Sequence, residues 1–188
     1  MLLDGRLLYI MAINIHKVDL NSWIRWATTE SQTVVEFGSM FFERLEHVNG
    51  NRIGIEIYKP YIDAARFHEC TKIQGDFRYF ESLVSEDDMD CAMFVDSLEH
   101  ITREEAFSLM SRVMDKFNKV IIMIPEGNHP MEQDETGYGG HEWQTHRSTW
   151  NAQDLVELGF EEKEITLDPG FHNHPERDTG CLFAVWSK

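Results

Sequence analysis

The sequence predicts an α/β fold in which one mostly parallel, seven-stranded sheet carries helices on both faces, giving three layers. Short apolar runs alternate along the chain with segments that have the spacing of amphipathic helices. Runs such as Val120–Ile124 lack polar alternation, which is typical of strands covered on both faces. The 188 residues contain no linker and no repeat, so we expect a single domain spanning 1–188.

The strands and helices are expected in alternating order. The strands are predicted at Thr33–Phe37, Arg52–Ile57, Lys72–Gln74, Cys91–Val95, Val120–Ile124, Glu164–Leu167 and Cys181–Trp186. The helices are predicted at Phe41–Val48, Pro60–Glu69, Phe77–Ser85, Thr102–Phe117 and Asn151–Leu158. Residues 1–32 are expected to form a helical extension before the first strand.

The clearest predicted helix is Thr102–Phe117. Thr102 and Glu105 have the spacing of a capping box, in which two side chains bind backbone N–H groups at the helix start. The apolar face follows helical spacing and consists of Ala106, Leu109, Met110, Val113 and Phe117. Elsewhere, Pro60 suits a first helical turn, and Gly159 ends the short helix at the end of the predicted series.

The last two strands are expected to differ from the others. The segment Leu167–Gly180 between them is rich in proline, glycine and histidine and has no helical pattern. Two strands joined without a helix usually pair antiparallel, so we expect the last strand to be antiparallel and the sheet to end in an antiparallel edge.

One long connection, Pro125–Thr149, follows the fifth predicted strand without any periodicity. Loops of this length inside a compact domain are usually functional or disordered. Its aromatic residues and histidines argue against disorder, and it begins where open α/β sheets bind ligands, at the carboxyl ends of the strands. We therefore expect it to form a wall or lid near a substrate pocket.

The net charge of the chain is strongly negative, with 33 acidic against 17 basic residues. Such a surface repels phosphate backbones and anionic lipids, which argues against nucleic acid and membranes as partners. The simplest interpretation of the charge is solubility.

Cysteine usage and the N-terminal sequence suggest a cytoplasmic protein. Cys70, Cys91 and Cys181 are widely spaced and form no C-x-x-C pair, so reduced thiols are expected rather than disulfides or a zinc knuckle. The apolar run Leu7–Ile15 is too short to span a bilayer. It also lacks the flanking features of a signal peptide.

Three acidic residues follow three successive predicted strands: Glu36, Glu56 and Asp76. Glu56 follows Glu36 by about the 20 residues that separate a nucleotide-binding loop from the acid that accepts both ribose hydroxyls. Asp76 could accept a hydrogen bond from the exocyclic amino group of adenine. A single acid at a strand end is usually a turn or cap residue, but three at one edge favour a nucleotide site.

The order of these motifs resembles that of the class I S-adenosylmethionine-dependent methyltransferases, over roughly Thr33 to Phe160. The segments that carry the resemblance are "VVEFGS", "GIEIYKPYIDAAR", "QGDF", "FVDSLEHI" and "HRSTWNAQDLVELGF". No one of them is specific, but five in the right order are. The resemblance implies a Rossmann-like sandwich, S-adenosylmethionine as cofactor and methyl transfer to a small-molecule or sugar-like acceptor.

The resemblance also implies roles for individual residues. Glu99, His100 and His146 would face the methyl group as catalytic residues. The cofactor would be held by Glu36, Phe37, Gly38, Ser39, Glu56, Ile57, Asp76, Phe77, Asp96, Ser97 and Leu98.

The first motif departs from the family pattern, which has glycines where this chain has Met40 and Phe42. The backbone there needs room beside the methionine part of the cofactor and often a positive φ, which costs a non-glycine residue roughly 1–2 kcal/mol. Methionine is flexible enough to fold aside. The alternative is a binding or scaffold protein that kept the fold and lost the cofactor. An NAD-dependent reductase is disfavoured because the G-x-G-x-x-G spacing is absent.

Histidines are the other chemical feature of the chain. A neutral imidazole could act as a general base on a substrate hydroxyl. It could equally ligate zinc, but no H-E-x-x-H or similar spacing is present, so the sequence predicts no metal ligands. For most of the histidines structural hydrogen bonding is expected, and His146 is favoured as functional because it lies in the family-like segment.

Overall fold

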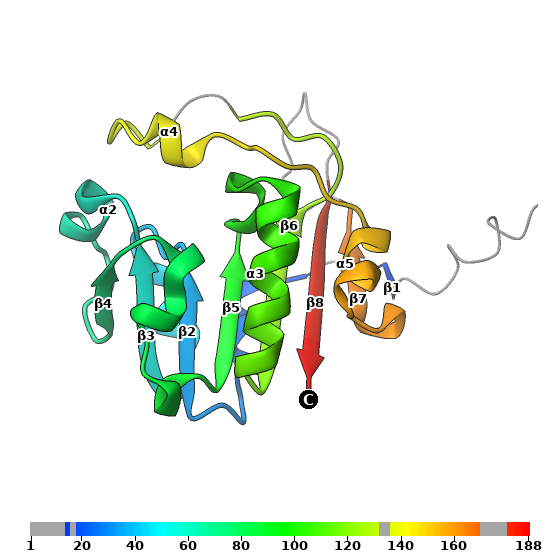
Figure 1. The fold of residues 1–188 in the computed structure, drawn as a ribbon, viewed down its shortest axis with the longest axis horizontal. Helices are drawn as coiled ribbons and strands as arrows, with labels where there is room; N and C mark the ends of the chain where they lie inside the picture. The colour runs from blue at the N-terminus through cyan, green and yellow to red at the C-terminus, as the bar shows by residue number, and fades with distance from the viewer. Residues whose placement is uncertain (1–13, 16–17, 132–135, 170–179) are drawn as a thin grey trace, which may run out of the picture.

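The computed structural model describes residues 14–15, 18–131, 136–169 and 180–188 and contains one eight-stranded sheet (Figure 1). The strand order is β1-β7-β8-β6-β5-β2-β3-β4. Every pairing is parallel except those of β8 with its two neighbours. The strands are β1 Asn14–Ile15, β2 Thr33–Phe37, β3 Asn51–Glu56, β4 Thr71–Gln74, β5 Cys91–Val95, β6 Lys119–Pro125, β7 Ile165–Asp168 and β8 Cys181–Ser187.

All seven predicted strands are present and the last strand, β8, is antiparallel as predicted, but the antiparallel pair of β7 and β8 does not end the sheet. The eighth strand, β1, has only two residues and pairs with β7 at the edge; a strand so short has no periodicity to detect. The antiparallel strand β8 is not an edge strand, because it lies between β6 and β7. Its first four residues, Cys181–Ala184, are fully buried, which suits an interior position.

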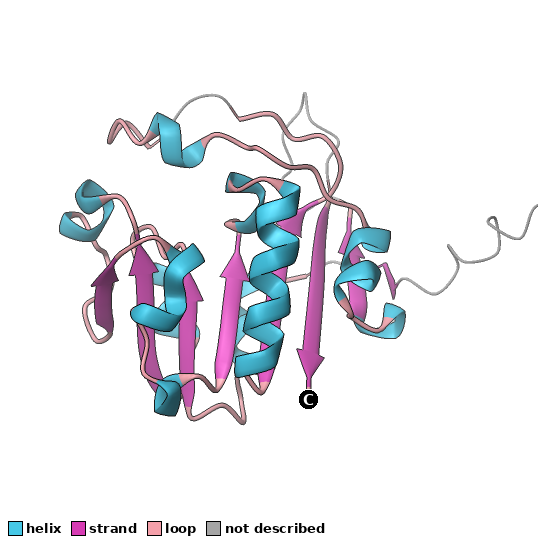
Figure 2. Ribbon diagram, in the orientation of Figure 1, coloured by secondary structure: helices cyan, strands magenta, loops and turns pink. Residues whose placement is uncertain are grey.

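The sheet has an apolar core on each face, as the three-layer prediction requires. Successive residues of β2 point to opposite faces: Val35 and Phe37 pack in one core, and Val34 in the other. The first core is covered by α3 (Arg103–Lys116), α5 (Ala152–Leu158) and η3 (Phe77–Ser82), where α denotes an α-helix and η a 3₁₀ helix (Figure 2).

The second core is covered by shorter elements. It is closed by α1 (Leu20–Ala27), η2 (Glu43–His47) and α2 (Lys59–Asp63). The remaining short helices are η4 Glu86–Asp88, η5 Leu98–His100, α4 His141–Gln144 and η6 Glu162–Glu164. No helix within the described ranges is both long and apolar enough to cross a bilayer.

The helix α3 begins as predicted. Thr102 Oγ1 accepts a hydrogen bond from the Glu105 N–H at 3.3 Å, and Glu105 Oε2 accepts one from the Thr102 N–H at 2.9 Å. Both bonds of a capping box are therefore present. The helix α5 begins with a second capping box, formed by Asn151 and Asp154. It ends at Gly159, which has a φ of 108°.

Three predicted helices are shorter than expected. The segment predicted as Phe41–Val48 contains only η2, because Phe42 has a φ of 64° and a helix cannot continue through a left-handed residue. The α2 helix ends at Asp63 rather than Glu69. In η3, Tyr79 has non-helical dihedral angles that interrupt the segment predicted as Phe77–Ser85. The predicted helical extension at 1–32 contains α1 and β1, and its residues 1–13 and 16–17 lie outside the described ranges.

Candidate functional site

A cavity of about 360 Å³ opens at the carboxyl ends of the parallel strands. The loop that begins at Pro125 and contains α4 passes over this edge of the sheet (Figure 1). The predicted site residues that line the cavity are Gly38, Glu56, Ile57, Asp76, Phe77, Asp96, Ser97, Glu99, His100 and His146. The loop contributes further lining residues, which are Pro125, His129, Met131, Trp143, Gln144 and Arg147.

Four predicted cofactor residues do not line the cavity. Phe37 is fully buried and stacks on Phe94 with ring centroids 4.5 Å apart. Leu98 is buried in the same core. Ser39 is buried and donates a hydrogen bond from its hydroxyl to the backbone oxygen of Glu36 at 3.2 Å. Glu36 is itself fully buried. These four residues are packed inside the protein, where they support the turns beside the cavity without lining it.

The turn after β2 has the backbone of a glycine-rich loop even though two of its residues are not glycine. Gly38, Met40 and Phe42 have φ values of 80°, 50° and 64°. A Cβ atom at Gly38 would lie 2.9 Å from Ser97 Cβ, so this glycine also allows the turns after β2 and β5 to meet. For the other two residues the left-handed conformation costs roughly 1–2 kcal/mol each.

The side chains of Met40 and Phe42 take different directions. Phe42 is fully buried in the second core, away from the cavity. Its ring occupies the space left by Gly54, where a Cβ atom would lie 2.5 Å from Phe42 Cδ1. Met40 is half-buried and lines the cavity. Only Met40 therefore bears on ligand binding.

Glu56 connects the end of β3 to this loop. Its Oε2 accepts a hydrogen bond from the Met40 N–H, and its Oε1 accepts one from the Tyr58 N–H, both at 2.8 Å. Burial raises the pKa of Glu56, while the backbone hydrogen bonds oppose that shift. Because an ionised carboxylate offers about four acceptor sites, Glu56 can hold the strained Met40 backbone and still accept from a ligand hydroxyl.

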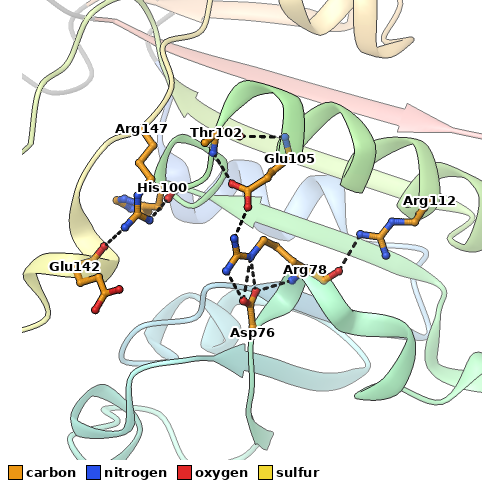
Figure 3. A network of polar contacts seen from close by, with 8 residues as sticks. All are labelled: Asp76, Arg78, His100, Thr102, Glu105, Arg112, Glu142 and Arg147. Atoms are coloured by element: carbon orange, nitrogen blue, oxygen red, sulfur yellow. Dashed lines mark hydrogen bonds and ion pairs between the residues drawn. The ribbon is translucent and has the colours of Figure 1, made fainter.

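Asp76 lies in an ion-pair network that sequence spacing did not indicate (Figure 3). Arg78 Nη2 donates to Asp76 Oδ2 at 2.6 Å, and Arg78 Nη1 also pairs with Glu105 at the start of α3. Burial acts to raise the pKa of Asp76, but the hydrogen bonds and charge of Arg78 outweigh it and lower that pKa. Asp76 therefore lines the cavity as an ionised carboxylate whose orientation is fixed by Arg78.

The turn after β5 brings a second cation to the cavity. Asp96 has a φ of 49°, a conformation in which aspartate is several-fold enriched. Arg44 of η2 reaches across the turn, with Nη2 at 3.3 Å from Asp96 Oδ2. Arg44 lines the cavity as well, although the sequence pattern did not point to it.

Glu36, in β2, has a fully buried carboxylate. No hydrogen-bond partner is found for either of its carboxylate oxygens within the described part of the chain. Burial raises its pKa to about 7, an effect that the positive charge of Arg44 only partly offsets. Folding therefore favours the protonated form of this side chain.

We expect this group to make stability depend on pH. The folded state binds more protons than the unfolded state between pH 4.5 and about 7, so the free energy of unfolding falls as pH rises through that range. A shift of this size corresponds to about 3 kcal/mol. Glu36→Gln should remove that part of the pH dependence in urea unfolding at pH 5 and pH 8. An unchanged difference between the two pH values in the variant would contradict the assignment.

The three residues predicted to be catalytic lie close together in the lining of the cavity. Glu99 and His100 belong to η5, whereas His146 comes from the loop after α4. His146 Nε2 lies 4.0 Å from Glu99 Oε1, and the rings of His100 and His146 are 5.0 Å apart at their centroids. One ligand atom from each of the three residues lies within 4.8 Å of the others.

Backbone hydrogen bonds fix the loop against η5. The Arg147 N–H donates to the Glu99 backbone oxygen at 2.7 Å. The Arg147 side chain donates to the His100 backbone oxygen, also at 2.7 Å (Figure 3). The His146 N–H donates to the Met131 oxygen at 3.1 Å, so both arms of the loop meet here. This pairing places the family-like segment at His146 over the cavity.

Burial determines the charge of this cluster. It lowers the pKa of His100 to about 4, and the neighbouring His146 adds to the effect, so the His100 ring is neutral at neutral pH. Burial, together with the negative charge of Asp96, raises the pKa of Glu99 well above its ordinary value. His129 lies beside the cluster, with its ring centroid 5.6 Å from that of His146.

Three solved structures have a similar fold. Phosphoethanolamine N-methyltransferase 2 of Haemonchus contortus, solved with S-adenosyl-L-methionine, aligns with a TM-score of 0.63 and 13% identity over 89% of this chain and 52% of that one. The N-terminal domain of EvdMO1, solved in the presence of SAH and D-fucose, aligns with a TM-score of 0.62 and 13% identity over 91% of this chain and 83% of that one. Small RNA methyltransferase HEN1 aligns with a TM-score of 0.60 and 14% identity over 90% of this chain and 24% of that one.

The chain has the fold of the class I S-adenosylmethionine-dependent methyltransferases. It spans 52% of the phosphoethanolamine N-methyltransferase and 24% of HEN1, so it corresponds to part of those proteins. No protein-family model matches the chain, and no curated protein matches its sequence. The similarity of this chain to the solved structures is therefore one of fold rather than of sequence.

Within this methyltransferase fold, the sequence pattern found the acids at the strand ends and missed their cationic partners. Arg78 follows Asp76 by two residues at a helix start, a spacing that could have indicated the ion pair. Arg44 had no comparable signal, because it reaches Asp96 only through tertiary structure. Arg147 was also missed, and it binds the backbone oxygens of His100 and Glu142.

Proposed function

We propose that this chain transfers a methyl group from S-adenosylmethionine to a small-molecule acceptor, with a hydroxyl of a sugar-like compound as the favoured nucleophile. The observation that supports this most is the single cavity shared by two groups of residues. Gly38, Glu56 and Asp76, from the cofactor motifs, line this cavity, and so do Glu99, His100 and His146. Its volume is within the range of small-molecule and cofactor sites.

The chemistry of the lining residues fits this cofactor. Glu56 has acceptor capacity left for ribose hydroxyls, and Asp76 presents an ionised carboxylate near which an adenine amino group could bind. When bound, the cofactor supplies an electrophilic methyl group on a sulfonium. The chain would hold the acceptor in near-attack geometry, beside Glu99, His100 and His146, which line the same cavity.

The proposal is tested by mass spectrometry of the reaction products. The purified chain is incubated with methyl-deuterated S-adenosylmethionine and a panel of sugars, sugar acids and small amines. We expect label in at least one hydroxylated acceptor, together with release of S-adenosylhomocysteine. Label that appears only in amines would contradict the favoured nucleophile, and label in none would contradict the proposal for these acceptors.

A second candidate function is a binding or scaffold protein that uses this fold without the cofactor. The observation that favours it is that Met40 lines the cavity where the family pattern has a glycine. In addition, the predicted ligand-binding carboxylates already have protein partners, since Glu56 binds two backbone N–H groups and Asp76 binds Arg78.

The substitution Met40→Gly separates the two functions. If Met40 folds aside, the variant should bind S-adenosylhomocysteine within about tenfold of the wild type, a difference of roughly 1.4 kcal/mol. We expect this result, because the Glu56 hydrogen bond already holds the Met40 backbone in the conformation that a glycine would adopt. Calorimetric titration of both proteins measures it. A wild type that binds nothing, combined with a Met40→Gly variant that binds, would instead show that Met40 closes the site.

A further inference from the structure

We propose that Glu99, His100 and His146 form a binding site for a divalent transition-metal ion in the lining of the cavity. Binding of the ion is inferred from the geometry of the site and does not depend on the proposed function. Its use in methyl transfer rests on the proposed function. Because no H-E-x-x-H spacing is present, the sequence predicted no metal site, whereas the structure assembles these ligands from two distant segments, η5 and the loop after α4.

The distances suit a site that closes around an ion. One ligand atom from each residue lies within 4.8 Å of the others, and His146 Nε2 is 4.0 Å from Glu99 Oε1. Ligands of one ion lie up to about 4 Å apart, which is twice a usual metal–ligand distance of roughly 2.1 Å. Small side-chain rotations are therefore enough to bring all three atoms into the coordination sphere.

Several polar atoms of the cluster lack a hydrogen-bond partner within the described ranges, and a cation could bind them. Glu99 is 2% exposed, and no hydrogen-bond partner is found within the described ranges for either of its carboxylate oxygens. The same is true of His100 Nδ1. A buried polar group without a partner is costly, and a buried charge more so, unless it is paired or binds a metal. One ion bound by these atoms would satisfy both residues.

The backbone around the cluster is held in place before any ion binds. The N–H groups of Arg147 and Ser148 donate to the backbone oxygen of Glu99, at 2.7 and 3.2 Å. The guanidinium of Arg147 donates to the backbone oxygen of His100. Such support fixes the positions of metal ligands and strengthens binding. The segment that carries His146 is thus fastened directly to the helix that carries the other two ligands.

The ligand set indicates the kind of ion. Two imidazoles and one carboxylate suit Mn²⁺, Fe²⁺, Co²⁺ or Zn²⁺, whereas Mg²⁺ and Ca²⁺ prefer sites made of oxygen alone. Three protein ligands leave coordination positions open toward the cavity. Two adjacent hydroxyls of an acceptor could occupy them, so the substrate class that fits best is a vicinal diol or an α-hydroxy acid.

The ion would prepare an acceptor hydroxyl for methylation. A bound cation lowers the pKa of a coordinated O–H group, so its proton is released to water. An oxygen–carbon bond then forms on the acceptor. The carbon–sulfur bond of the donor sulfonium breaks, and its electron pair stays on sulfur as a neutral thioether.

Cobalt binding tests the site without any need for activity. The full chain is freed of metal with a chelator and titrated with Co²⁺ alone, whose visible absorption reports histidine coordination, and bound metal is counted after dialysis. We expect one tightly bound Co²⁺ per wild-type chain. Both His146→Ala and Glu99→Gln should weaken binding by more than about 100-fold, the upper range for losing even an outer-shell partner. His68→Ala is the matched control, because it removes an exposed histidine near β4.

The two ligand variants protect the test against misfolding, since Glu99→Gln keeps the size of the buried side chain and its circular dichroism should match the wild type. Tight Co²⁺ binding that survives in both ligand variants, or wild-type binding no stronger than that of the ligand variants, would overturn the site. S-adenosylhomocysteine is titrated separately into metal-free wild type. Binding of S-adenosylhomocysteine without Co²⁺ binding would contradict only the metal site, and the reverse would contradict only the proposed function.

Discussion

Glu56→Ala is expected to weaken the binding of S-adenosylhomocysteine by about 1.5–3 kcal/mol, which is the contribution of hydrogen bonds to a charged group. The carboxylate has two tasks in the proposed site. It accepts from the Met40 N–H at 2.8 Å, which holds the left-handed loop, and it lines the cavity, where its remaining lone pairs could accept from ribose hydroxyls. Calorimetric titration of the variant and the wild type measures the difference.

Two further variants make this result specific. Glu56→Gln keeps the side-chain volume but turns an NH₂ group toward the Met40 or Tyr58 N–H, so it should also weaken binding. Glu43→Ala removes a half-exposed acid that pairs with Arg66 on the surface of η2, and it should leave binding unchanged. Equal affinity in the wild type and in a well-folded Glu56→Ala variant would show that Glu56 stabilises the loop and does not bind the ligand.

Phe42→Ala is expected to destabilise the fold by about 3–5 kcal/mol, the usual cost of removing a buried phenylalanine ring. Phe42 is fully buried in the second core and fills the space above Gly54. Phe42→Gly should be less destabilising than Phe42→Ala by about 1 kcal/mol, because glycine adopts the φ of 64° without strain. Urea unfolding of both variants gives the two differences.

The ordering of the two Phe42 variants is the informative result. Trp26→Ala serves as the control, since Trp26 is 66% exposed and surface substitutions usually change stability by less than about 0.5 kcal/mol. If Phe42→Gly were as stable as the wild type, the ring would contribute little to the core. Phe42 would then be a replaced loop glycine without a structural role of its own.

Most of the fold could be predicted because its signals are local. The strands β5 and β6 are uninterrupted apolar runs, and the capping box of Thr102 and Glu105 marks the start of α3 within four residues of sequence. What failed depended on tertiary context. The position of β8 inside the sheet is decided by pairing with β6 and β7, which no local pattern records. The late start of the helix after β2, at Glu43 instead of Phe41, depends on the left-handed conformation of Phe42.

In the candidate site, too, local features could be predicted and features that depend on tertiary structure could not. Parallel strands end at one edge of the sheet, so Glu56 and Asp76 could be expected to lie near each other from their places in the sequence. The ion pair of Asp96 could not be expected, because its partner Arg44 reaches it from a different element. The convergence of Glu99 with His146 likewise depends on how the loop folds back over the sheet, and spacing along the chain could not reveal it.

The central claim is that the cavity beneath the long loop binds the methyltransferase cofactor, and titration of the purified wild-type chain with S-adenosylhomocysteine tests it most directly. We predict binding of one equivalent with a dissociation constant in the micromolar range, a free energy of about −8 kcal/mol, and a loss of affinity in Glu56→Ala. No binding heat at millimolar S-adenosylhomocysteine, from protein that circular dichroism shows to be folded, would contradict the claim.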